Sequence, residues 1–397
     1  MVNMKRIYLD NSATTRVFPE VIDEMRLVWS SDYGNPSSVH REGEMARRLL
    51  EEGRDSIARS LGALSEEVFF TSGGTESNNW AVHALFALGQ KGAVIDSGKI
   101  TFTGISKKRV IISSIEHPSI LKTCEQLRRE GADVVFLPVD QYGLVSALSL
   151  EKALSDDTAF VSIMYANNEI GIIEPVKELS EIAHAHGVLF HTDAVQAVGS
   201  LSIDAHDLGV DALSFSAHKF GGPTGTGGLF IRSGIKFEPF IVGGGQEYGH
   251  RAGTENLAGV IGMAKALELA YTDFSSKKEK MISIRDHLIS DVLKTIPGSH
   301  LSGHPSKRLP GNAHFTFDKI DGEALLLYLN LKGYACSSGS ACTSKKAESS
   351  HVLSAIGLND NVAKSALRIS LGRDNTEEEV LSIVPVLDKI ISDLRNR

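Results

Sequence analysis

Short apolar runs rich in β-branched and aromatic residues alternate with helical patterns along the first two thirds of this chain. The runs that predict buried strands are Val68–Thr71, Val110–Ser114, Val134–Leu137, Phe160–Tyr165, Val188–Thr192 and Ala212–Phe215. The helical patterns that follow several of them are Ser77–Leu88, Ser119–Glu130 and Val176–His186. This alternation is typical of a mostly parallel sheet with helices on its faces. Ligands of such folds bind at the carboxyl ends of the strands, so the residues that follow each strand are the first site candidates.

The sequence pattern changes after about residue 260, where a long helical stretch spans Leu257–Leu293 and a strand-like run follows at Ala313–Phe317. A chain of 397 residues is longer than one ordinary hydrophobic core serves, so we expect two domains. We assign residues 15–260 to a large α/β domain with a mostly parallel, seven-stranded-type sheet flanked by helices. Residues 1–14 and 261–397 are assigned to a smaller α+β domain.

The segment Gly89–Lys108 lies between a helical pattern and a strand and is rich in Gly, Lys, Ser and Thr. This composition favours an exposed excursion over a buried element. We expect a short hairpin around Lys99–Phe102.

Composition excludes several classes of partner. The chain is 42% hydrophobic and 23% charged, which is the balance of a soluble globular protein, and its net charge of −8 favours neither a nucleic-acid nor a membrane partner. No apolar run is long enough to span a bilayer, and Met1–Asp10 lacks the apolar stretch of a secretory signal. We therefore expect a cytoplasmic protein.

The three cysteines are Cys124, Cys336 and Cys342. They form no C-x-x-C pair and no zinc-like set, so no metal site is expected. So few cysteines, in an odd number, are typical of a reducing compartment. A functional cysteine in this chain is therefore expected to act as a thiol.

Two groups of polar residues follow strands in the first half of the chain. The glycine-rich run Thr71–Ser77 lies between a strand and a helix, where backbone amides and the helix N-terminus favour an anion. It lacks the Lys-Ser/Thr end of a P-loop, and taken alone it is better explained as a glycine-rich turn with a helix cap. His117 follows the next strand, where it can stack on a flat ring or move protons, although a lone histidine is more often structural. Asn168 follows a third strand and can bind polar groups at the same edge.

The two sharper candidates are Asp193 and Lys219. Asp193 ends a predicted strand, and a buried carboxylate there needs a cationic partner such as a protonated pyridine nitrogen, unless it simply caps the next helix. Lys219 follows another strand, is preceded by Ser216 and His218, and is followed by glycines. A Schiff-base lysine needs a neutral amine, which burial and neighbouring cations promote. The succession of glycine-rich turn, His, Asp and Lys, each at a strand end, argues against a solvated loop lysine.

These motifs together resemble the fold-type I pyridoxal-phosphate enzymes, in the class V aminotransferase branch. The resemblance covers almost the whole chain. The runs that carry it are Tyr8–Thr15, Tyr33–Ser38, Asp193–Gln196, Ser216–Lys219, Val161–Gly171 and Leu367–Gly372.

The resemblance implies pyridoxal 5'-phosphate as cofactor, bound covalently by Lys219, with Asp193 on the ring nitrogen, His117 stacked on the ring and Gln196 at its phenolic oxygen. The residues that it implies for phosphate binding are Gly74, Thr75, Ser216 and His218. Thr254 is implied to reach the phosphate of the partner subunit, so the family pattern implies a homodimer with shared sites.

The reaction depends on the second domain, where Ser337–Ser344 is a run of small polar residues around Cys342. Such a segment, within a loop of about residues 336–350, is expected to be mobile, and a thiol on it can ionise. The alternatives are a surface cysteine on a linker and a pair with Cys336. The run resembles the active-site loop of the cysteine desulfurases of the NifS/IscS class, group I. By that resemblance Cys342 becomes a persulfide when sulfur is removed from L-cysteine to leave alanine. A transient role of Cys342 as an iron–sulfur ligand during sulfur transfer is also compatible with the resemblance.

The same resemblance gives the roles of Lys219 and His117 in proton transfer and places Arg368 on the substrate carboxylate, with Asn35 and Asn168 as helpers. A guanidinium suits this role because it bonds both carboxylate oxygens at once. The expected partner is a sulfur-acceptor protein such as an iron–sulfur scaffold. Relatives that serve scaffolds often have a longer tail than the one ending at Arg397, so the acceptor stays open.

Three rival functions remain at this point. A selenocysteine lyase shares the cofactor chemistry, but the cysteine loop here differs from the short, buried loop of the selenocysteine-preferring group. A transaminase would not need Cys342. A non-catalytic docking protein would not need Lys219, Asp193 and Cys342 together.

Overall fold

The structure is a computed structural model that describes residues 6–96, 98–339 and 350–396. Its centre is a seven-stranded sheet in the order β2-β10-β9-β8-β7-β5-β6. The strands are β2 (Val68–Thr71), β10 (Gly227–Ile231), β9 (Ala212–Ser216), β8 (Leu189–Asp193), β7 (Thr158–Ser162), β5 (Arg109–Ser113) and β6 (Asp133–Leu137). Strand β10 runs antiparallel to β2 and β9, and the pairs from β9 to β6 are parallel. The predicted α/β class with a mostly parallel seven-stranded sheet is therefore confirmed.

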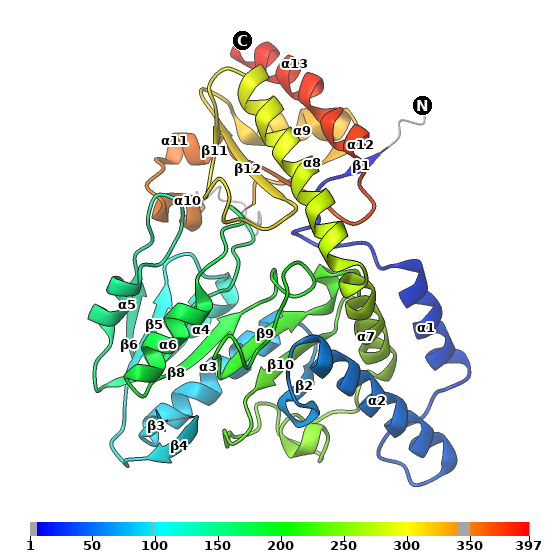
Figure 1. The fold of residues 1–397 in the computed structure, drawn as a ribbon, viewed down its shortest axis with the longest axis vertical. Helices are drawn as coiled ribbons and strands as arrows, with labels where there is room; N and C mark the ends of the chain where they lie inside the picture. The colour runs from blue at the N-terminus through cyan, green and yellow to red at the C-terminus, as the bar shows by residue number, and fades with distance from the viewer. Residues whose placement is uncertain (1–5, 97, 340–349, 397) are drawn as a thin grey trace.

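Helices cover both faces of this sheet (Figure 1). Within β5, Val110 and Ile112 pack into the core that holds α3 and α4, whereas Ile111 between them packs into the core that holds α1, α2, α6 and α7. This alternation follows from the two-residue period of a strand, and burial on both faces explains the nearly continuous apolar runs. The bounds are α1 (Pro19–Ser30), α2 (Arg41–Ser60), α3 (Gly74–Gln90), α4 (Pro118–Arg129), α5 (Ala147–Ala153), α6 (Val176–Ala185) and α7 (Leu257–Tyr271).

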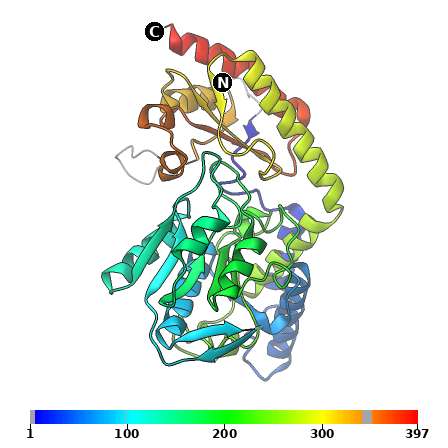
Figure 2. The same cartoon turned by 60° about the vertical axis from the view of Figure 1, so that its left-hand side comes forward.

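A second, smaller layer lies above the sheet in Figures 1 and 2 and has its own core. Its antiparallel sheet has the order β11-β12-β14, and the N-terminal strand β1 pairs with β13 beside it. The strands are β1 (Ile7–Tyr8), β11 (Ser299–Leu301), β12 (Asn312–Phe317), β13 (Tyr334–Ala335) and β14 (Leu367–Ser370). The helices are α8 (Phe274–Thr295), α9 (Gly322–Leu331), α10 (His351–Ala355), α11 (Asp360–Ala363), α12 (Glu377–Leu381) and α13 (Ile383–Arg395). The smaller α+β part that the sequence predicted is present.

The helical stretch predicted at Leu257–Leu293 is two helices, which is a correction. Helix α7 ends at Tyr271 and α8 begins at Phe274, because Asp273 adopts a left-handed conformation with φ 51° that no helix continues. The buried residues of α7 belong to the core of the large part, and those of α8 belong to the small one. We propose a two-domain division with its boundary at this break rather than at residue 260.

The predicted hairpin around Lys99–Phe102 is confirmed. Strands β3 (Ala93–Asp96) and β4 (Lys99–Phe102) pair antiparallel, and Ile95 also donates its backbone N–H to the Gly187 carbonyl at 3.2 Å. Ile95 is buried with the α3 and α4 core, so the excursion is attached to the large part.

No helix in the described ranges is long and apolar enough to cross a membrane. Likewise, the described side chains hold no cluster of three or more His, Cys, Asp or Glu residues suited to a metal ion.

Candidate active site

A hydrogen-bonded network joins the ends of two strands to two helices. Asp193 is the last residue of β8, and its Oδ2 accepts a hydrogen bond from Asn78 Nδ2 of α3 at 2.6 Å. The same Nδ2 donates to Ser119 Oγ at 2.8 Å, and Ser119 Oγ lies 2.7 Å from Nδ1 of His117. His117 follows β5 and caps α4, so the strand-end argument from the sequence places Asp193 and His117 together correctly.

The carboxylate of Asp193 is buried, with 4% of the residue exposed. Its oxygens accept from Asn78 and from the Val195 backbone N–H at 3.0 Å, and no ion pair of Asp193 exists among the described residues. A buried carboxylate without a cation is costly. Asp193 therefore suits a cationic N–H group such as a pyridinium.

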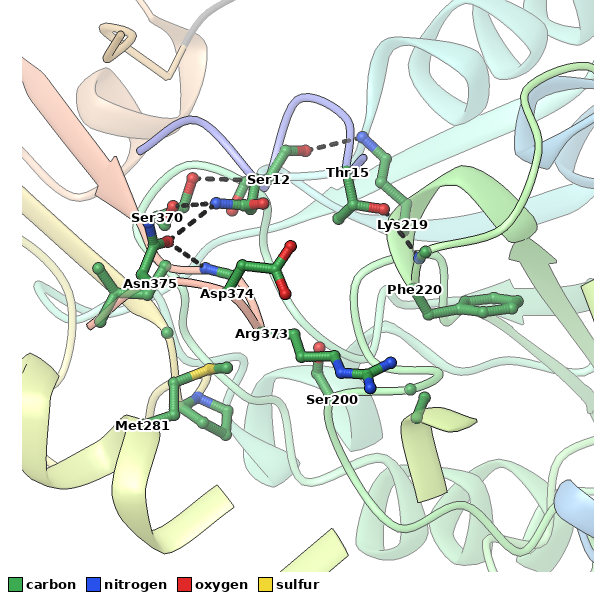
Figure 3. Close-up of a pocket in the computed structure, with 18 of the residues that line it drawn as sticks. Ser12, Thr15, Ser200, Lys219, Phe220, Met281, Ser370, Arg373, Asp374 and Asn375 are labelled. Carbon is green, nitrogen blue, oxygen red and sulfur yellow. Dashed lines mark hydrogen bonds between the residues drawn. The ribbon is translucent and has the colours of Figure 1, made fainter. Parts of the chain in front are cut away.

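Lys219 follows β9 in a short 3-10 turn, Ala217–Lys219. Its Nζ donates to the carbonyl oxygens of Ser12 at 2.7 Å and Ala13 at 2.8 Å, a contact that Figure 3 shows at the edge of the N-terminal segment. Burial, together with the charge of Arg368, lowers the pKa of Lys219 to about 8, although Asp193 and Asp10 oppose the shift. An amine with this pKa is partly neutral at neutral pH, as Schiff-base chemistry requires.

The glycine-rich turn at the start of α3 provides an anion site. Gly73 precedes the helix with φ 152° and ψ 177° and gives it no side-chain cap, so the amides of Gly74 and Thr75 are left for a ligand. A Cβ on Gly74 would lie 2.6 Å from Val195 Cγ2 and 3.6 Å from Ser216 Cβ. The predicted residues Gly74, Thr75 and Ser216 thus share one corner, and a helix N-terminus there favours a phosphate.

Two further predicted residues lie beside the N-terminal segment. Gln196 donates from Nε2 to the Ser12 carbonyl at 2.9 Å. His218 Nδ1 lies 3.1 Å from Thr14 Oγ1, and burial lowers the pKa of His218 to about 4, with the charge of Lys219 adding to the effect. His218 is therefore neutral and can act as donor or acceptor, but not as a cation.

These features together fit pyridoxal phosphate. The uncapped N-terminus of α3 suits its phosphate, the unpaired Asp193 suits its ring nitrogen, and the amine of Lys219 suits its aldehyde carbon.

Arg368 on β14 is buried, with 3% of the residue exposed. Nη2 pairs with Asp10 Oδ1 at 2.7 Å, and Nη1 donates to the carbonyl oxygens of Asn168 at 2.8 Å and Gly339 at 3.3 Å. Nε is buried and has no partner among the described residues. A carboxylate bound by this guanidinium would use Nε and share Nη2 with Asp10. Asn168 thus contacts Arg368 through its backbone.

Two predicted residues are not joined to this network by any described bond. Asn35 is exposed in the α1–α2 connection, at the lower right of Figure 1, and its Oδ1 accepts from the Ser37 N–H at 2.9 Å within the same turn. Thr254 is exposed, but its neighbour Arg251 pairs with Glu76 in the first turn of α3 at 2.9 Å. The roles of Asn35 and Thr254 stay predictions.

Cys342 lies outside the described residues. On either side of residues 340–349, Gly339 accepts from Arg368 and Ser350 Oγ donates to Glu169 Oε2 at 2.5 Å. The thiols of the other two cysteines stay protonated at neutral pH. Burial raises the pKa of the Cys124 thiol to about 12 and also raises the pKa of the Cys336 thiol. Neither is suited to act as a thiolate.

A cavity of about 840 Å³ meets the site from the side of the N-terminal segment. Its lining includes Ser12, Thr15, Gln196, Lys219, Ser370 and Arg373, most of which Figure 3 labels. It lies between the first turns of α8 and the large part. Lys219 is among the residues that line this cavity, whereas Asp193 and His117 are not.

The sequence analysis missed three polar residues of the site: Asn78, Ser119 and Asp10. Asn78 lies one turn after Gly74, and Ser119 lies two residues after His117. Both positions therefore share a helix end with a predicted residue, and this spacing is the signal that would have found them. Asp10 gave no such signal, because its partner Arg368 is distant in sequence.

Comparisons with known proteins agree with this geometry. The class V aminotransferase family matches residues 7–383. A cysteine desulfurase IscS of Methanosarcina thermophila is 46% identical over 99% of this chain and 93% of its own length, and one of Dictyoglomus turgidum is 46% identical over 99% and 96%. A solved structure of a NifS-like protein superposes with a TM-score of 0.89 at 37% identity, covering 98% of this chain and all of the other. The chain therefore belongs to the class V aminotransferase family and, within it, to the pyridoxal-phosphate-dependent cysteine desulfurases.

Proposed function

We propose that this chain takes sulfur from L-cysteine with Lys219 as the cofactor-binding lysine and Cys342 as the sulfur acceptor. The observation that carries the proposal is that the charges of the Lys219 amine and of the buried Asp193 carboxylate interact, while this carboxylate forms no salt bridge with any described residue. Pyridoxal phosphate supplies, when bound, a sink for the electron pair released at the substrate's Cα.

Each residue then has a stated task. Asp193 holds the ring nitrogen, and the α3 N-terminus with Gly74, Thr75, Ser216 and His218 holds the phosphate. The Nζ of Lys219, as a free amine, would take the Cα proton, which its pKa of about 8 allows. Arg368 binds the substrate carboxylate.

The sulfur transfer is a displacement at sulfur. The Cys342 thiolate attacks the substrate's sulfur, an S–S bond forms, and the Cβ–S bond breaks with its electron pair kept by carbon. Cβ then takes a proton and Cα takes back the proton held by Lys219, so the products are alanine and a persulfide on Cys342. Cys124 and Cys336 are poor nucleophiles here, because their thiols stay protonated.

A homodimer with shared sites and a protein sulfur acceptor complete the proposal. Thr254 is exposed, which leaves it accessible to a partner subunit, and we propose that it reaches the phosphate site of that subunit. Mixing Lys219→Ala with Thr254→Ala chains tests the sharing, because only the mixture would contain one intact site. The acceptor is proposed to be an iron–sulfur scaffold or another sulfur carrier, with Cys342 as a transient cluster ligand and a cytoplasmic location.

The central test is the mass of the cysteine-bearing peptides after incubation with L-cysteine. We expect one added sulfur on Cys342, absent in Cys342→Ala and unchanged in the matched variant Cys336→Ala. Alanine should form without any keto acid, which a transaminase could not do. Sulfide release at the wild-type rate by Cys342→Ala, or added sulfur on Cys336, would refute the assignment.

A further inference from the structure

The network behind His117 has a definite direction. Asn78 Nδ2 lies 2.6 Å from Asp193 Oδ2, and a carboxylate oxygen only accepts, so the amide must present its NH2 group to Asp193. The reversed amide would place two oxygens against each other. The second hydrogen of Nδ2 then points to Ser119 Oγ at 2.8 Å, so Ser119 accepts from Asn78.

The backbone N–H of Ser119 fixes the state of Nδ1. It points to Nδ1 of His117 at 3.2 Å, and a backbone N–H can only donate, so this nitrogen holds a lone pair. The Ser119 hydroxyl, which accepts from Asn78 and lies 2.7 Å from the same nitrogen, then donates its own hydrogen to that lone pair. The proton of the neutral ring is therefore on Nε2.

We propose that Asn78 and Ser119 are positioning residues that hold His117 as a neutral ring with its proton on Nε2. This inference deepens the proposed function, because it rests on His117 facing the substrate. Nε2 has no hydrogen-bond partner in the described part of the chain. Its N–H is thus available to an acceptor in the site, and we assign the substrate's sulfur to it.

This tautomer prevents His117 from acting as a base toward the substrate. A ring protonated on Nε2 has no lone pair there, and its only lone pair, on Nδ1, is occupied by Ser119. His117 therefore binds the sulfur as a hydrogen-bond donor and is not the base that takes the proton from the substrate thiol. That leaves Lys219 as the basic group that the site presents to the substrate.

The charges around His117 agree with a neutral ring. Burial lowers the pKa of His117, and positive charge on Lys219 or His351 acts in the same direction, whereas Asp193 opposes them. These are the charged groups that act on the ring from β8, from the turn after β9 and from α10. The donors on Nδ1 add to burial, since protonation would set three hydrogens against one another.

The test uses nitrogen NMR spectra of the histidine rings in the full chain, with and without pyridoxal phosphate, and the His117 signal is found by its loss in His117→Gln. We expect the Nε2–H form in the wild type and in Ser119→Thr, which keeps the hydroxyl. In Ser119→Ala one donor is lost, so the pKa of His117 should rise by up to about one pH unit and kcat should fall about threefold to tenfold. Ser180→Ala removes a buried hydroxyl of another helix, α6, which donates to the Leu208 carbonyl outside this network, and it should change neither.

The outcomes separate this inference from the proposed function. An Nδ1–H ring in the wild type, or a pKa of His117 in Ser119→Ala that is unchanged or lower, overturns the inference while leaving sulfur transfer intact. Because the ring signals are also read without cofactor, they test the inference even if Cys342 proves not to carry the sulfur.

Discussion

The amine of Lys219 should be much more reactive at neutral pH than an ordinary lysine amine. Burial is the main reason that its pKa falls from 10.5 to about 8, and Arg368 contributes to the shift. A shift of this size raises the neutral fraction at pH 7 about 300-fold, to roughly a tenth of the molecules. The same shift affects folding, because the unfolded chain binds more protons than the folded chain between the two values. Stability should therefore rise with pH from about 8 to 10.5, by about 3 kcal/mol from this group.

Competitive amine labelling of the cofactor-free chain measures this directly. A limiting amine reagent is applied over a pH series, and the labelled fraction of each lysine peptide is read by mass spectrometry. Lys177 is the internal reference, because it is exposed and its hydrogen bond to Asp207 raises its pKa above the ordinary range. We expect a midpoint near pH 8 for Lys219 and a much higher one for Lys177.

Two variants test the causes of the shift. Arg368→Leu removes a cation and should move the Lys219 midpoint to higher pH, whereas Asp193→Asn removes an anion and should move it lower. A wild-type midpoint near that of an ordinary lysine, or a shift of opposite sign in Arg368→Leu, would show that burial and charge do not prepare this amine.

Two further predictions concern the frame of the site. Glu247→Ala should lower the free energy of unfolding in urea by about 3–5 kcal/mol, because it leaves the Arg54 guanidinium buried without its partner. Both Nη atoms of Arg54 donate to Glu247 at 2.8 Å. Replacing both residues by apolar ones should recover much of the loss, and a change below about 1 kcal/mol in the single variant would contradict this reasoning. Gly74→Ala should weaken cofactor binding about tenfold in an absorbance titration, because its Cβ would lie 2.6 Å from Val195 Cγ2. Val195→Ala in the same chain should restore affinity, and equal affinity in the single variant would refute the steric argument.

The parallel part of the sheet was predictable because its strands are apolar on both faces and are followed by helical patterns. Strand β10 was missed, since the run around Gly227 and Gly228 has the composition of a loop. A Cβ on Gly228 would lie 2.1 Å from the ring of Phe215 on the neighbouring strand, so its glycine is required by packing across the sheet. The break at Asp273 was likewise hidden, because the helical pattern continues through it and only the backbone conformation ends the helix.

In the site, too, residue positions could be predicted from the sequence, whereas protonation states could not. Asp193, His117 and Lys219 could be predicted because each follows a strand, and parallel strands bring their carboxyl ends to one edge of the sheet. Their protonation states could not, because these depend on side chains from other elements. Asn78 on α3 bonds both Asp193 and Ser119, and Ser119 in turn determines which nitrogen of His117 carries the proton. The sequence motifs therefore identified the groups that meet at this edge of the sheet, while the direction of each hydrogen bond between them, and with it the proposed division of roles between Lys219 and His117, required the packed structure.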